Sequence, residues 1–81
     1  MMEPSNVVIE LSRAEAIVLY DWLSRFNKSH DHLFQDQAEQ RVLWDLEATL
    51  ESMLVEPFDP GYQKFLAAAR DRVRDAEGKG R

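Results

Sequence analysis

Polar and apolar residues alternate near the N-terminus of the chain, over residues 6–11. Val7, Ile9 and Leu11 fall on one side of an extended backbone, and β-branched residues with a period of two indicate a short strand. No other stretch of the sequence has this pattern. We therefore expect a single strand, whose backbone donors and acceptors have no partner strand in the same chain.

The apolar period then changes to that of a helix, and Ser12 and Glu15 mark the change. A serine followed three residues later by a glutamate is a capping box, which predicts a helix over residues 13–27. Apolar side chains cover most of the circumference of this helix and leave an exposed strip that contains Asp21 and Arg25. Such a helix must be central in its domain or shared with another chain.

Asp36 followed by Glu39 repeats the cap pattern and predicts a second helix over residues 36–56. One wide apolar face of this helix consists of Ala38, Val42, Leu43, Leu46, Leu50, Met53 and Leu54. A narrower apolar stripe on another side consists of Trp44, Ala48 and Val55. Because tryptophan is common where chains bind one another, the narrower stripe is a candidate docking face.

Asp59 and Pro60 predict the start of a third helix over residues 60–76, with the aspartate as its N-cap. The proline fits the first turn, where its missing N–H has no partner to lose. The predicted fold class is therefore mainly α, with a short N-terminal strand followed by three helices.

A chain of 81 residues supports one domain, residues 1–81, with ends at 1–5 and 77–81 that we expect to fray. The lone strand has two interpretations. It is an extended strap over the helical core, or it pairs with the same segment of another copy across a twofold axis. The apolar surfaces favour the homodimer. The candidate interface residues are Val7, Ile9, Leu11, Trp44, Ala48 and Val55.

The order strand, helix, helix over residues 6–55 resembles the ribbon-helix-helix family of DNA-binding proteins and antitoxins. The resemblance implies a dimer with paired strands, whose outward ribbon face enters the major groove. The outward residues here are Asn6, Val8 and Glu10, none of which is basic, so DNA reading through a ribbon is not expected. The segment 42–47 is also similar to short bacterial proteins of unassigned function, which implies no activity.

The net charge of −5 is unevenly distributed. Residues 1–56 carry four basic and eleven acidic side chains, whereas residues 57–81 carry six basic and four acidic ones. Binding to a phosphate backbone depends on lysine and arginine, so an acidic chain with a pI near 4.9 is not expected to bind nucleic acid.

His30, Asp31 and His32 form a cluster in which the two histidines can supply imidazole ligands to a metal ion. Either Asp31 or Asp36 can add a carboxylate ligand. A solvated polar loop explains the same cluster, and we assign no metal. Glu47 and Glu51 are neighbours on the second helix, where they are either a solvated face or an acid–base pair.

We expect no catalytic residue and no cofactor, since the chain has no cysteine and no glycine-rich phosphate loop. No apolar run is long enough for a bilayer and no secretory signal is visible, so we expect a cytoplasmic bacterial protein without membrane contact. The predicted function is a small non-enzymatic protein-interaction or adaptor domain, homodimeric, with a possible protein partner. The alternatives are a ribbon-helix-helix-like regulator or antitoxin, and a metal-dependent enzyme that uses His30 and His32.

Overall fold

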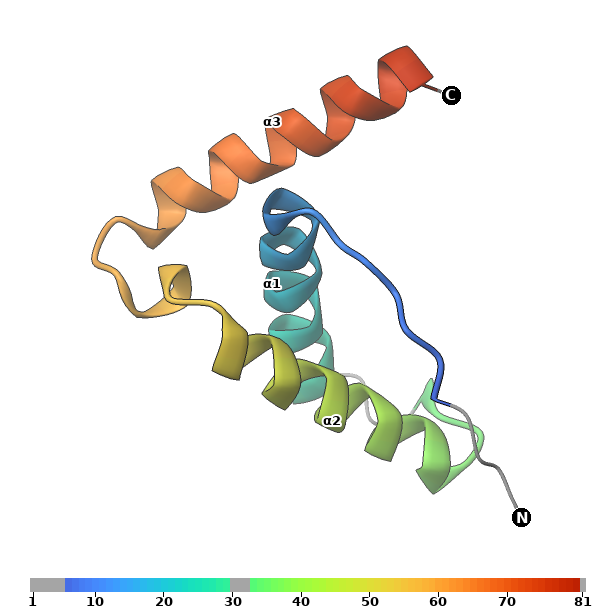
Figure 1. Ribbon diagram of the computed structural model, residues 1–81. Helices are drawn as coiled ribbons and strands as arrows, with labels where there is room; N and C mark the ends of the chain where they lie inside the picture. The colour runs from blue at the N-terminus through green and yellow to red at the C-terminus, as the bar shows by residue number, and fades with distance from the viewer. Residues whose placement is uncertain (1–5, 30–32, 81) are drawn as a thin grey trace.

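The computed structural model describes residues 6–29 and 33–80, with side chains described up to Lys28 and from Leu33 to Asp75. The described chain is mainly helical, as the sequence predicts (Figure 1). Its elements are α1 (Arg13–Ser29), α2 (Gln37–Met53), the short 3-10 helix η2 (Glu56–Phe58) and α3 (Tyr62–Gly80).

The helix α1 lies between the other two long helices, with α3 on one side of it and α2 on the other (Figure 1). This placement explains why so much of its circumference is apolar. Leu23, near the middle of α1, is fully buried. The buried core consists of Ile17, Leu23, Leu50, Leu54, Leu66 and Ala69, which come from α1, α3 and the region of α2.

The start of α1 confirms the predicted capping box. The Ser12 hydroxyl accepts a hydrogen bond from the Glu15 backbone N–H at 3.0 Å, and the Glu15 carboxylate accepts one from the Ser12 N–H at 2.8 Å. Asp36 likewise caps α2, because its carboxylate accepts from the Ala38 N–H at 2.7 Å. Local sequence therefore determines where these two helices begin.

The end of α2 differs from the prediction, since the helix ends at Met53 and not at residue 56. Leu54 adopts an extended conformation with φ −111° and ψ 140°, and its side chain is buried in the core. Pro57 follows in η2 and has no N–H to donate to the Met53 carbonyl, so the α-helix cannot continue through this point.

The bounds of α1 and α3 also differ from the prediction. Helix α1 continues to Ser29, two residues beyond the expected end. The Asp59 carboxylate accepts from the Gly61 N–H at 2.7 Å, which makes a turn before α3 and moves its start to Tyr62. At its other end α3 extends to Gly80, through residues that we expected to fray.

Residues 6–12 precede α1 and have no regular secondary structure within the chain. In Figure 1 this segment is blue and runs from the start of α1 back toward the start of α2. All of its residues are exposed, with Val7 at 88% and Ile9 at 75%. Residues 6–11 form no hydrogen bond with another described residue. The pairing of this segment with a second chain stays a prediction.

The chain has a large surface for its mass. It exposes 6386 Å², whereas a compact protein of 9.4 kDa exposes about 5,000 Å². The radius of gyration is 14.7 Å, compared with about 12 Å for a compact domain of this length. Residues 6–12 and several large apolar side chains of the helices are exposed.

Candidate functional site

An apolar hollow of about 440 Å³ lies between the N-terminal segment, α1 and α2. We call it the α1–α2 groove. Ile9 and Leu11 form one wall, α1 contributes Leu19, and α2 contributes Leu46, Thr49 and Met53, among other residues. The described residues that line the groove include no carboxylate, and their single charge is that of Arg13.

The groove exists because the wide apolar face of α2 is only partly covered. Leu50 is buried and Leu46 packs against the core, but Met53 is 68% exposed. Val42, on the same face, also remains in solvent. The sequence predicts this face but does not show how little of it the chain itself can cover.

Arg13, at the edge of the groove, is already paired. Its Nε donates to Glu56 Oε2 at 2.6 Å and its second guanidinium nitrogen donates to Glu56 Oε1 at 2.9 Å. The hydrogen bond from Arg13 is the main reason why the pKa of the Glu56 carboxyl lies below its usual value. This ion pair connects the start of α1 to η2. Because Glu56 neutralises the charge of Arg13, the groove is essentially apolar.

The predicted interface residues divide into two groups. Ile9 and Leu11 line the groove. Trp44, Ala48 and Val55 are exposed and lie outside the groove lining, with Trp44 at 47% exposure. We call this second group the Trp44 face. Its exposure shows that Trp44 is not part of the core of the single chain.

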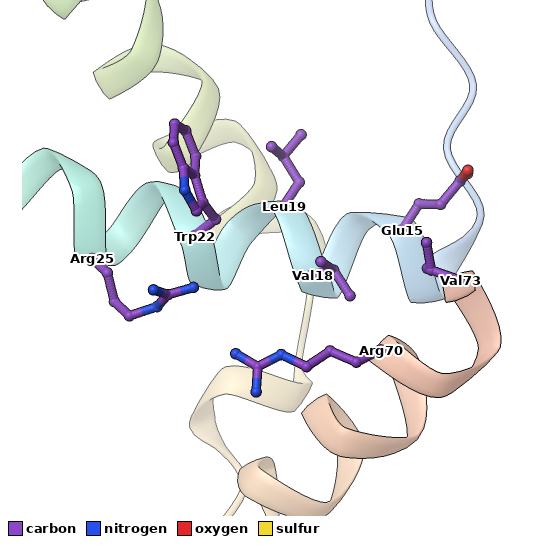
Figure 2. A pocket seen from close by; sticks show the side chains of 7 residues that line it. All are labelled: Glu15, Val18, Leu19, Trp22, Arg25, Arg70 and Val73. Carbon is purple, nitrogen blue, oxygen red and sulfur yellow. The ribbon is translucent and has the colours of Figure 1, made fainter. Parts of the chain in front are cut away.

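A second hollow, of about 340 Å³, lies between α1 and α3 (Figure 2). Figure 2 shows Arg25 from α1 and Arg70 from α3 reaching toward the same space. Both side chains bind the Oδ2 atom of Asp21, at 3.0 Å from Arg25 Nε and 3.3 Å from Arg70. Glu15 lines the hollow, and the Asp21 carboxylate binds both guanidinium groups, so two carboxylates balance the two positive charges and no excess positive charge is left for an anion.

Asp21 was expected on an exposed strip, and that expectation is wrong. Its side chain is only 16% exposed, and its Oδ1 atom accepts a hydrogen bond from the Tyr62 hydroxyl at 3.0 Å. Burial of Tyr62, and then the hydrogen bond and charge of Asp21, raise the pKa of the Tyr62 phenol well above its usual range. Asp21 thus connects α1 to two positions of α3.

Glu47 has a similar structural role between α1 and α2. Its Oε1 accepts a hydrogen bond from Asn27 Nδ2 at 2.7 Å, and the same amide lies 3.4 Å from the Leu43 carbonyl oxygen. Burial, followed by the charges of Glu51 and Glu47, raises the pKa of the Tyr20 phenol. The two glutamates therefore lie near a phenol at the α1–α2 contact, and Glu47 acts there as a hydrogen-bond acceptor.

The histidine cluster cannot be located, because His30, Asp31 and His32 lie outside the described residues. Asp36, the further carboxylate offered for this cluster, is used as the cap of α2. Within residues 6–28 and 33–75, no three histidine or acidic side chains come together as a metal site. Because the two histidines lie outside these ranges, the metal alternative stays a prediction.

Comparison with family models, with curated proteins and with solved structures gave no match for the chain. Among the described residues, none of the helices has the length and apolar character that crossing a bilayer requires.

Proposed function

We propose that the chain is a small, non-enzymatic protein-interaction domain that works as a homodimer, in a bacterial cytoplasm as the sequence leads us to expect. The observation that carries the proposal is the apolar surface that the single chain leaves in water. It includes the α1–α2 groove and the N-terminal segment beside it. Burial of apolar surface is the main driving force for association of protein chains.

The size of this surface suits a stable dimer. The chain exposes 6386 Å², which is about 1,400 Å² more than a compact protein of its mass. A standard interface buries about 800 Å² on each partner, and permanent homodimers bury more. The groove and the exposed N-terminal segment beside it are the apolar surfaces that such an interface would bury.

The Trp44 face gives this dimer a place for a further protein. Because it lies outside the groove lining, it remains accessible when the groove is covered. Helix α2 carries four carboxylates and one guanidinium group, so the charge of its surroundings favours a basic partner with an apolar anchor. This is the adaptor role within the proposal.

Light scattering over a dilution series tests the homodimer, with Met53→Glu and Gln63→Glu as a matched pair. Both variants add one negative charge at an exposed helical position, but only Met53 lines the groove. We expect the wild type and Gln63→Glu to have the mass of a dimer and Met53→Glu to be a monomer with unchanged helix content. A wild-type chain that is monomeric at every concentration would contradict the proposal.

A further inference from the structure

The geometry points to one occupant for the α1–α2 groove, the N-terminal segment of a second copy of this chain. In the resulting dimer, residues 7–9 of each copy lie beside the other copy's residues 9–11 and place apolar side chains in the other copy's groove. The inference rests on the proposed homodimer and goes further, because it states which segment fills which site.

The N-terminal segment is exposed and rich in apolar residues. Val7 and Val8 are 88% and 84% exposed and Ile9 is 75% exposed. Val7 and Ile9 lie on the same side of the extended segment, so packing against the groove of a second copy would bury both and recover free energy, at about 25 cal/mol per Å² of apolar surface. The described chain itself offers these residues little cover, although Ile9 already reaches the edge of the groove.

The distribution of charge also favours contact between the groove and the segment. The chain carries a net charge of −5, so two copies repel each other over most of their surface. The described residues that line the groove include no carboxylate, and the guanidinium group of Arg13 is held by Glu56. Residues 6–12 carry a single charge, that of Glu10. The groove and the segment are therefore surfaces on which two acidic chains can meet with little repulsion.

The backbone of the segment also favours pairing with a second copy. Residues 6–11 form no hydrogen bonds with the described chain. A second copy of the segment, placed beside Ile9 and Leu11, supplies donors and acceptors of the right spacing. Side chains alternate along an extended segment, so Val7, Ile9 and Leu11 of each copy lie on one side. In the pair of segments this side can face the groove of each copy. A twofold axis makes the exchange reciprocal, so that neither copy is left with an open groove.

The absence of cysteine from the chain permits a direct test by crosslinking. One preparation carries Val7→Cys and another carries Thr49→Cys, at an exposed position that lines the groove. The two are mixed, allowed to exchange subunits and oxidised mildly. Since each chain has one thiol, a disulfide between residues 7 and 49 can form only between two copies, with Cα atoms about 4.4–6.8 Å apart.

The control replaces the Thr49→Cys preparation by Gln63→Cys, at an exposed position of α3 that lines no described part of the groove. We expect about tenfold more mixed disulfide with position 49 than with position 63, because thiols held together react at a much higher effective concentration. Circular dichroism of each variant checks that the helices are retained.

The outcomes separate this inference from the proposal on which it rests. A dimer by light scattering with the mixed disulfide supports both. A dimer whose disulfide yield at position 49 equals that at position 63 overturns the assigned occupant and leaves the homodimer standing. A monomeric wild type overturns the homodimer and this inference with it. Val8→Pro and Ile9→Pro give a second test, because the N–H groups of adjacent residues point to opposite edges of an extended segment and one of the two prolines must therefore remove a donor that faces the partner. An unchanged fraction of dimer in both variants contradicts the backbone pairing.

Discussion

Replacement of Asp21 by asparagine removes the charge that connects α1 to α3. In the wild type, one oxygen of Asp21 accepts from the Tyr62 hydroxyl and the other binds Arg25 and Arg70. Asparagine keeps an oxygen that can accept from Tyr62, but its amide cannot bind the two guanidinium groups as a carboxylate does. The substitution therefore tests the connection without creating a cavity.

The magnitude follows from the exposure of each partner. A hydrogen bond to a charged group contributes about 1.5–3 kcal/mol, part of which the asparagine oxygen retains for Tyr62. The side chains of Arg25 and Arg70 are largely in solvent, so each ion pair adds between about 0 and 1 kcal/mol. We expect Asp21→Asn to lower the free energy of unfolding by about 1–2 kcal/mol, out of about 4–12 kcal/mol for a chain of this length.

Urea unfolding followed by circular dichroism measures this loss, with Asp71→Asn as the control. Asp71 binds Arg74 within α3, and both side chains are about two-thirds exposed, so its loss should cost less than about 0.5 kcal/mol. In thermal unfolding the two variants should differ by about 4–8 °C for each kcal/mol. Equal losses for Asp21→Asn and Asp71→Asn would show that Asp21 does not hold α1 against α3.

Three further substitutions test the core, the Tyr62 environment and the Trp44 face. Leu50→Ala should lower the free energy of unfolding by about 2–5 kcal/mol because Leu50 is buried, and a loss below about 0.5 kcal/mol in urea unfolding would contradict this packing. The pKa of Tyr62 is raised in the folded chain, so its neutral phenol stabilises the fold. This contribution is complete below the unfolded pKa of about 10 and is lost as the pH rises above that value. The wild type should therefore lose more stability above this pH than Tyr62→Phe, and equal losses in alkaline urea titrations would refute this. Trp44→Ala should change the free energy of unfolding by less than about 1 kcal/mol, whereas a loss of about 3 kcal/mol or more in the same assay would place Trp44 in the core.

Much of the helical architecture can be predicted from local sequence. The Ser12–Glu15 capping box and the Asp36 cap occur as the pattern predicts, because a cap depends only on residues within one turn. The apolar circumference of residues 13–27 indicates a central helix, and α1 lies between α2 and α3. The early end of α2 also has a local signal, which is Pro57. The prediction extended the helix to residue 56 because Leu54 and Val55 continue the apolar pattern.

Other features could not be predicted, because they depend on contacts between distant parts of the chain. Asp21 lies in a polar strip by its position on the helix, and only the approach of α3 brings Tyr62 and Arg70 to it. The sequence shows Asp21 and Arg25 one turn apart, which is the only local sign of this cluster. The wide apolar face of α2 likewise gives no sign that Met53 stays in solvent, since that depends on how much surface three helices can cover.

The role of the N-terminal segment in the proposed dimer is tested by comparing the mass in solution of the full chain with that of a variant lacking residues 1–11. This deletion leaves Ser12 in place as the cap of α1, and the buried core comes from residues after it. We expect light scattering to give a dimer for the full chain and a monomer for the shortened chain, with the same helix content by circular dichroism. A shortened chain that remains dimeric with native helix content would contradict the claim that the N-terminal segment and the α1–α2 groove build the assembly.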